Sequence, residues 1–297
     1  SSLILNRFEY NIKILIYRRL FMKVEEIQKI SKELRKDIIE MIYRAKSGHP
    51  GGSLSIADIL AVLYWKEMNI DPKNPKMENR DRLVLSKGHA APALYAALIE
   101  KGFLGDEGKS LIPTLRKWHS PLQGHPDMKK LAGVEMSTGS LGQGLSAANG
   151  MALSAKIYNN DYRVYAILGD GELQEGQIWE AAMTAAHYKL DNLVAIVDYN
   201  NLQIDGKVSD VMDVAPIGEK FKAFKWNVIE IEGKSIAISL ATLACLSIFL
   251  KENRNSLCKT SLKQSFFFQK NHDNFSLIVL INLIKTNIKK ILVKCRN

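Results

Sequence analysis

Two short apolar runs, separated by one helix-compatible segment, constrain the fold more than any other feature of this sequence. The first, Val164–Leu168, ends in Gly-Asp-Gly, and the second, Leu193–Val197, ends in Asp-Tyr-Asn-Asn. Short, β-rich apolar runs of this kind are typical of buried parallel strands. A parallel pair needs a crossover of about a dozen residues or more, and the segment between the runs supplies it. We therefore predict an α/β fold with a mostly parallel sheet flanked by helices.

Polar residues follow both predicted strands. Asp170 comes directly after the first strand and Asn200 after the second, so both should lie at the carboxyl edge, where open α/β sheets bind ligands. A carboxylate, an amide oxygen and a nearby backbone carbonyl suit Mg²⁺ or Ca²⁺, and Mg²⁺ usually adds phosphate oxygens to a few protein ligands. The pattern predicts a metal–diphosphate site. The simpler interpretation is a Gly-Asp-Gly turn that binds nothing.

The positive charge of the chain lies at its two ends. The net charge is +10, of which residues 1–21 carry +3 and residues 234–297 carry +9, so residues 22–233 carry −2. A basic chain would ordinarily suggest nucleic acid or an anionic membrane as a partner. Because the basic character belongs to the ends, it says nothing about the partners of the central segment, for which we expect neither nucleic acid nor membrane.

Glycine and proline divide the chain at nearly the same places. All 19 glycines lie between Gly48 and Gly233, and all eight prolines between Pro50 and Pro216. A globular α/β segment as long as residues 234–297 normally needs these residues at turns and helix ends. We therefore expect a central domain at 22–233, with a leader at 1–21 and a tail at 234–297 that differ from it.

Location is predicted from the cysteines and the apolar segments. The three cysteines all lie in the tail, without Cys-x-x-Cys spacing, which favours reduced thiols in the cytoplasm. The uncharged run 235–250 is shorter than the roughly 20 apolar residues that a membrane span needs. The leader also lacks the continuous apolar region of a signal peptide. We expect a soluble cytoplasmic protein.

The first part of the central domain predicts two helices joined by a histidine-containing loop. Apolar residues recur at three- and four-residue steps from Ile27 to Ala45, which indicates an amphipathic helix. His49 follows in Ser-Gly-His-Pro-Gly-Gly, and Ser55 with Asp58 predicts the cap and first-turn acid of a second helix. Gly and Pro orient His49 through the backbone. The alternative is an ordinary surface imidazole.

Two more histidines stand beside glycine. His89 follows the apolar strand Leu83–Leu85, and His125 lies between Gly124 and Pro126. The turn 137–144 then opens an alanine-rich helix, and a glycine-rich turn of this kind lets the backbone approach a flat or anionic ligand.

Taken together and in order, these motifs resemble the cofactor-diphosphate half of transketolase, a thiamine-diphosphate enzyme. The resemblance covers residues 22–233 and rests on six motifs: SGHPGG (47–52), LSKGHA (85–90), GHP (124–126), STGSLGQG (137–144), GDGELQEG (169–176) and DYNNLQIDG (198–206). It implies a three-layer thiamine-diphosphate-binding fold.

The resemblance also implies the cofactors and their ligands. Mg²⁺, with Ca²⁺ or Mn²⁺ as possible replacements, would be bound by Asp170, the side-chain oxygen of Asn200 and the carbonyl oxygen of Leu202. The remaining cofactor-binding residues would place backbone near the diphosphate, pack near the rings or line the cofactor: Gly169, Gly171, Glu172, Gly139, Leu141 and His89.

The catalytic residues implied by the resemblance are three histidines and one carboxylate. His49, His89 and His125 would bind sugar hydroxyls and handle protons, work that suits an imidazole with an ordinary pKa near 6.5. Glu175 would be the family's buried carboxylate that links active sites across a dimer. Its alternative role is a first-turn acid stabilised by the helix dipole.

The resemblance predicts a transfer of two-carbon ketol units between sugar phosphates in the pentose phosphate pathway. The second domain of full-length transketolases does not follow residue 233 in this sequence. We therefore expect the N-terminal subunit of a split transketolase, active only with a C-terminal partner subunit in a dimer of heterodimers. The alternatives are an inactive relic that still binds the cofactor, or a related enzyme such as deoxyxylulose phosphate synthase.

The leader and tail do not resemble the family. We interpret them as translated upstream sequence and a shifted reading frame, with a lineage-specific extension as the alternative. His272 lies in a context unlike the family's further substrate-facing histidine, so no role is transferred to it. If the tail is real as written, the sheet loses an expected strand, and we then expect an exposed edge beside the apolar run 275–284.

Overall fold

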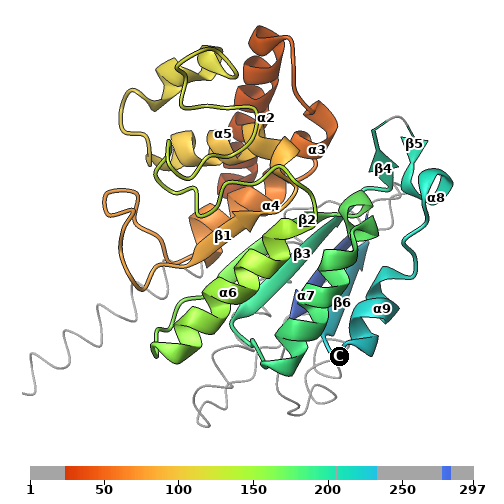
Figure 1. The fold of residues 1–297 in the computed structure, drawn as a ribbon. Coiled ribbons are helices and arrows are strands. Elements are labelled where there is room, and N and C mark those ends of the chain that lie inside the picture. The colour runs from red at the N-terminus through yellow and green to blue at the C-terminus, as the bar shows by residue number, and fades with distance from the viewer. Residues whose placement is uncertain (1–23, 205, 233–275, 282–297) are drawn as a thin grey trace, which may run out of the picture.

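The computed structural model describes residues 24–204, 206–232 and 276–281, and within them one five-stranded sheet lies between helices (Figure 1). The strand order is β1-β2-β3-β7-β6. The strands are β1 (Arg82–Leu85), β2 (Val164–Gly169), β3 (Leu193–Tyr199), β6 (Asn227–Glu232) and β7 (Ser276–Ile281). β1, β2 and β3 are parallel neighbours, with Val164 opposite Leu193 and Gly169 opposite Asp198. The two predicted parallel strands are therefore confirmed.

Alternate residues of the central strands enter two separate hydrophobic cores. Tyr165 and Ile167 of β2 belong to one core, whereas Ala166 and Leu168 belong to the other. Successive side chains of a strand point to opposite faces, so a strand buried on both sides feeds two cores. This accounts for runs that are apolar throughout rather than alternating.

Helices cover both faces and complete a three-layer α/β arrangement. One core is closed by α2 (Val24–Ala45), α4 (Ala57–Val62) and α5 (Ala91–Lys101), and the other by α6 (Gln143–Ile157), α7 (Gly176–His187) and α9 (Ile217–Ala223). Figure 1 shows α6 and α7 lying across the face of the sheet, and the α2–α5 group beyond it. The predicted fold class is confirmed.

The helix at the start of the described chain follows its apolar periodicity. The predicted positions Ile27, Leu34, Ile38 and Met41 of α2 are all buried. In contrast, α6 places small residues against the sheet, because Ala148 and Ala152 are fully buried. Small side chains allow the backbone of this helix to lie close to the strands.

The segment after α2 differs from the sequence prediction. His49 precedes a short helix, α3 (Pro50–Leu54), and α4 is capped by Ile56 rather than Ser55. The Ser55 cap was therefore wrong, because its hydroxyl donates instead to the carbonyl of Gly52 and to Asp198. Asp58 does lie in the first turn of α4, as predicted. The helix then ends in a π-helical segment, Leu63–Glu67.

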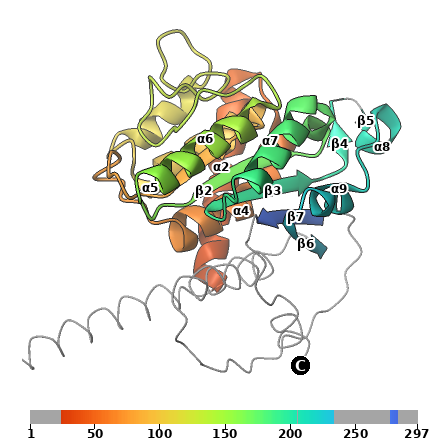
Figure 2. The same ribbon diagram turned by 60° about the horizontal axis from the view of Figure 1, so that its bottom comes forward.

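The sheet contains a strand from the tail, contrary to expectation. β7 pairs antiparallel with β3 on one side and with β6 on the other (Figure 2). The predicted exposed edge beside residues 275–284 is thus wrong, because residues 276–281 fill the gap between β3 and β6. A short apolar β-rich run is sufficient to complete both ladders with backbone hydrogen bonds.

The remaining elements are short and lie mainly near the strand ends. They are η2 (Gly88–Ala90), η3 (Gly108–Thr114), η4 (Gly171–Gln174), β4 (Leu202–Gln203), β5 (Gly206–Lys207) and α8 (Val208–Val211). β4 and β5 form a separate two-stranded hairpin, and β4 begins at Leu202, the last of the predicted metal ligands. Within the described ranges, no helix has the length and apolar character needed to cross a bilayer. Residues 1–21, His272 and the three cysteines lie outside the described residues, so the predicted nature of both ends stays a prediction.

Candidate active site

The carboxyl edge of the sheet brings the predicted metal ligands together. Asp170 follows β2 and is 2% exposed, and its carboxylate accepts hydrogen bonds from the backbone amides of Gly171 and Asn201. The amide oxygen of Asn200 accepts a hydrogen bond of 2.9 Å from the Leu202 amide. Asp170 and the Asn200–Leu202 segment therefore share one corner of the edge, as parallel pairing of β2 and β3 requires.

The chemistry of this corner fits a divalent cation. Burial raises the pKa of Asp170 to about 6, while the amides of Asn201 and Gly171 oppose that rise by donating to its carboxylate. A buried carboxylate without a strong cationic partner gains from a bound metal ion. The described residues hold no cluster of three His, Cys, Asp or Glu side chains. The predicted ligand set is of another kind, with one carboxylate, one amide oxygen and one backbone carbonyl.

Glycine is required at several points around this corner. A Cβ atom on Gly171 would lie 3.2 Å from Cδ of Gln203, so a larger residue would press on the hairpin that follows the metal ligands. Gly139 and Gly142 have φ values of +153° and +84°, in the region that favours glycine. Gly142 is the N-cap residue of α6 and has no side chain to accept hydrogen bonds from the first amide groups of the helix, so these amides face the turn. Leu141 is half-buried in the same turn.

The Glu172 carboxylate faces the protein rather than the edge. It is 2% exposed, and it accepts hydrogen bonds from the hydroxyl of Ser86 and from the backbone amides of Gly142 (2.9 Å) and Gly169 (3.0 Å). Burial raises the pKa of Glu172, and these three donors lower it. Three separate motifs therefore meet at one carboxylate.

His49 and His89 are brought together by the loops that carry them. Their ring centroids lie 5.2 Å apart in an edge-to-face arrangement. Gly52 allows this approach, since a Cβ atom there would lie 3.0 Å from Nε2 of His89. Burial lowers the pKa of His89 to about 4, helped by the positive charge of Lys87. At neutral pH, His89 is thus a neutral imidazole that can accept a proton.

His125 joins the same group from a different segment. A Cβ atom on Gly139 would lie 3.1 Å from the His125 ring, so the glycine turn packs directly on this imidazole. The Tyr95 hydroxyl lies 2.9 Å from the carbonyl oxygens of both Gln123 and His125 and fixes the local backbone. Burial and the nearby Arg116 lower the pKa of His125. The three predicted histidines therefore converge beside the turn, although His49 and His125 remain exposed.

Glu175 lies at the start of α7 and is exposed on this single chain. Its side chain makes no capping hydrogen bond to α7. A Cβ atom on Gly142 would lie 2.7 Å from Cβ of Glu175, so the turn and the helix start are in contact. Its predicted role across a dimer stays a prediction.

A buried ion pair at the centre of the site was missed by the sequence analysis. Nζ of Lys87 lies 2.7 Å from the carboxylate of Asp198, with side chains 2% and 1% exposed. Lys87 also donates to the carbonyl of Gly52 (2.8 Å), and Asn200 donates to Asp198 (3.3 Å). The sequence did contain a signal, because Lys87 and Asp198 each stand just after an apolar run. A charged side chain in such a position is buried only when it is paired.

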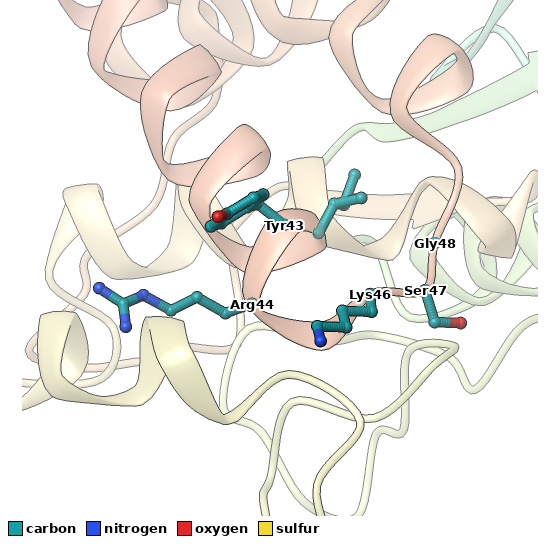
Figure 3. Close-up of a pocket in the computed structure, with 6 residues that line it drawn as sticks. Tyr43, Arg44, Lys46, Ser47 and Gly48 are labelled. Atoms are coloured by element: carbon teal, nitrogen blue, oxygen red, sulfur yellow. The ribbon is translucent and has the colours of Figure 1, made fainter.

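A surface hollow of about 490 Å³ lies at the end of α2 (Figure 3). Arg44 and Lys46 extend from the last turn of the helix, and Ser47 and Gly48 lie in the loop that follows it. None of the predicted site residues lines this hollow. It borders the first histidine motif without being part of the histidine group.

A family model described as the thiamine diphosphate binding domain of transketolase matches residues 26–261. The chain belongs to the transketolase family. It carries the N-terminal thiamine-diphosphate-binding domain, and the match continues past residue 233 into the tail.

The similar relatives include separate subunits as well as full-length transketolases. The chain is 49% identical over 208 residues to the 6-deoxy-6-sulfo-D-fructose transketolase subunit SqwG of a Clostridium species, covering 70% of this chain and 74% of that protein. It is 46% identical over 212 residues to an apulose-4-phosphate transketolase subunit of Phocaeicola vulgatus, covering 71% and 74%. Human transketolase is 45% identical over 217 residues, but the match covers only 34% of that protein.

Solved transketolase structures share the fold. The Campylobacter jejuni enzyme superposes with a TM-score of 0.64 at 39% identity, covering 68% of this chain and 32% of that one. A Pichia stipitis transketolase superposes with a TM-score of 0.70 at 33% identity, covering 77% and 34%. The chain thus spans about a third of the length of these full-length enzymes.

Proposed function

We propose that this chain is the N-terminal subunit of a split transketolase. It would transfer a two-carbon ketol unit from a ketose phosphate to an aldose phosphate, using thiamine diphosphate and Mg²⁺. The observation that carries the proposal is the convergence of Asp170, Asn200 and the three histidines at one edge of a transketolase-family domain.

The ligand roles are those that the family resemblance implies, and the contacts at the sheet edge support them. Asp170, the amide oxygen of Asn200 and the carbonyl of Leu202 would bind Mg²⁺, and Ca²⁺ or Mn²⁺ present similar demands for oxygen ligands. Gly169 and Gly171 would allow the diphosphate to lie against the backbone. Gly139 and Leu141 would pack near the rings of the cofactor.

When bound, thiamine diphosphate supplies a thiazolium ring that holds the carbanion during transfer. The protein's part is to orient the substrate and to move protons at its oxygens. Neutral His89 would accept a hydrogen bond from a sugar hydroxyl through its unprotonated ring nitrogen, and the more exposed His49 and His125 would bind hydroxyls beside it. Glu175 would act across a dimer.

The lengths of the relatives support the assignment as one subunit of two. The chain covers 74% of two relatives that are named as subunits and 34% of human transketolase. We therefore propose a C-terminal partner subunit, assembly into a dimer of heterodimers, and a place in cytoplasmic sugar-phosphate metabolism such as the pentose phosphate pathway. The two relatives are named for different sugars, so the sugar phosphate itself is left open.

The proposal is tested by titrating thiamine diphosphate and Mg²⁺ into the chain, with and without a C-terminal transketolase subunit, and by measuring ketol transfer. The proposal is supported if the chain binds thiamine diphosphate and Mg²⁺ and if ketol transfer occurs only in the presence of the partner subunit. Turnover by the chain alone would contradict the partner requirement. Binding without turnover in the complex would favour the inactive relic.

A further inference from the structure

Asp170 and Glu172 are two buried acids only two residues apart, and they face different parts of the site. Asp170 points toward the backbone of Asn201, on the hairpin side. Glu172 points toward Ser86 and Gly142, on the side of the glycine turn. A single residue, Gly171, therefore separates a candidate metal ligand from a carboxylate with another role.

The Glu172 carboxylate is occupied by the protein itself. One of its oxygens accepts hydrogen bonds from Ser86 and Gly142, and the other accepts from Gly169. A carboxylate that is 2% exposed and bound to three donors offers little to a ligand. A second negative charge facing a diphosphate would also repel it. Glu172 is therefore poorly suited to the direct cofactor contact that the resemblance implied for it.

The three donors come from segments that must be held in register. Ser86 directly follows β1, Gly169 is the last residue of β2, and Gly142 is the N-cap of α6. The packing is close, since a Cβ atom on Gly144 would lie 2.7 Å from the Cα atom of Ser86. Nothing larger than a hydrogen atom fits there, so the turn lies directly on the strand end.

We propose that Glu172 is a positioning residue. Together with Ser86, it holds residues 139–144 of the glycine-rich turn against the ends of β1 and β2. This inference rests on the proposed function, because the turn it holds is the one that would pack near the cofactor rings. The same turn contacts His125 through Gly139. Glu172 thus shapes the cofactor surface and the histidine group without touching substrate.

The first test measures amide hydrogen exchange in the full chain without cofactor. In Glu172→Gln, one carboxylate oxygen becomes a donor group, so at least one of the amides of Gly142 and Gly169 loses its acceptor. We expect exchange at that amide to become at least roughly tenfold faster, while α2 keeps its protection. Unchanged exchange at both amides would overturn the proposal.

The second test measures thiamine diphosphate affinity in the presence of Mg²⁺ and the C-terminal partner. Ser86→Ala and Glu172→Gln should each weaken binding by at least about fivefold, because the turn is no longer held in place. The matched control is Ser31→Ala. Ser31 is also fully buried and also donates its hydroxyl to a carboxylate, that of Asp58, but in the α2–α4 region.

Comparison with the control separates positioning from general stability. Ser31→Ala should lower the melting temperature to a similar degree and leave cofactor affinity within about twofold of the wild type. Equal loss of affinity in Ser31→Ala and Ser86→Ala would overturn the proposal, as would wild-type affinity in Glu172→Gln. If the wild-type complex itself binds no thiamine diphosphate, the proposed function fails, and the exchange measurement alone decides whether Glu172 holds the turn.

Discussion

The carboxylate of Asp170 accepts a hydrogen bond from the backbone amide of Asn201, which lies 31 residues further along the chain. This contact exists because β2 and β3 are parallel neighbours with Gly169 opposite Asp198. Residues that directly follow two such strands emerge side by side at the carboxyl edge. The position of the proposed metal–diphosphate site is therefore a consequence of strand register.

Replacing Asp170 should abolish the metal site while the fold persists. Asp170→Asn removes the single anionic ligand, so we expect Mg²⁺-dependent affinity for thiamine diphosphate to fall at least roughly 100-fold. Calorimetric titration measures the change. Asp210→Asn is the control, because Asp210 is an exposed acid in the short helix α8 after the hairpin. Equal affinity in the two variants would contradict the assignment of Asp170.

Breaking the buried ion pair should destabilise the protein strongly. Lys87→Met removes the neutralising ammonium group from the Asp198 carboxylate, which is 1% exposed, and loss of one partner of a buried ion pair costs about 3–5 kcal/mol. The double variant Lys87→Met with Asp198→Asn should recover part of this loss, because the uncompensated charge is gone. Urea denaturation measures the free energy of unfolding of the single and of the double variant.

The control for that prediction is a surface ion pair of the same residue types. Lys156 lies 2.6 Å from Asp191, with side chains 34% and 39% exposed. Lys156→Met should change the free energy of unfolding by at most about 1 kcal/mol. A loss as small as this in Lys87→Met would show that the buried pair contributes little.

His89 should make the fold less stable in acid. Its pKa is about 4 in the folded chain, compared with about 6.5 when unfolded. The unfolded state then binds more protons between these values, so stability is complete above about pH 6.5 and declines as the pH falls toward 4. Melting temperatures measured across this range should depend less on pH in His89→Gln. An equally steep dependence in the variant would assign the effect to other groups.

Asp37 should have the opposite effect. This α2 residue is 7% exposed, and burial together with the neighbouring Glu100 carboxyl group of α5 raises its pKa to about 7. The folded state therefore binds the proton more tightly, and the contribution to stability is lost as the pH rises from about 4 through 7. Asp37→Asn should raise the melting temperature at pH 8 by roughly 2–4 °C, which corresponds to about 1 kcal/mol after allowance for partial screening by solvent.

The control for Asp37 is Glu33→Gln on the exposed face of the same helix, where Glu33 forms an ion pair with Lys36. We expect a much smaller shift in its melting temperature at pH 8. If Asp37→Asn melts at or below the wild-type temperature at that pH, the protonated carboxyl is not the cause of the pH dependence.

Much of the fold could be predicted because its patterns are local. The apolar period of α2 and the uniform burial of β2 and β3 follow from residue order within each element. The role of Ser55 could not be predicted from its neighbours. Its hydroxyl donates to Asp198, 143 residues away, instead of capping α4. The strand β7 was missed for a related reason, since the space between β3 and β6 is a property of the assembled sheet.

The sequence by itself determined the order of the motifs and the two parallel strands, and it indicated which residues to propose as ligands and as catalytic histidines. Only the tertiary structure decided what each side chain faces. Ser86 and Glu172 are 86 residues apart, and Lys87 and Asp198 are 111 apart. Such contacts depend on strand register and on how closely glycine lets two backbones approach. For this reason the sequence could not distinguish an acid that faces the metal corner from one that holds the turn.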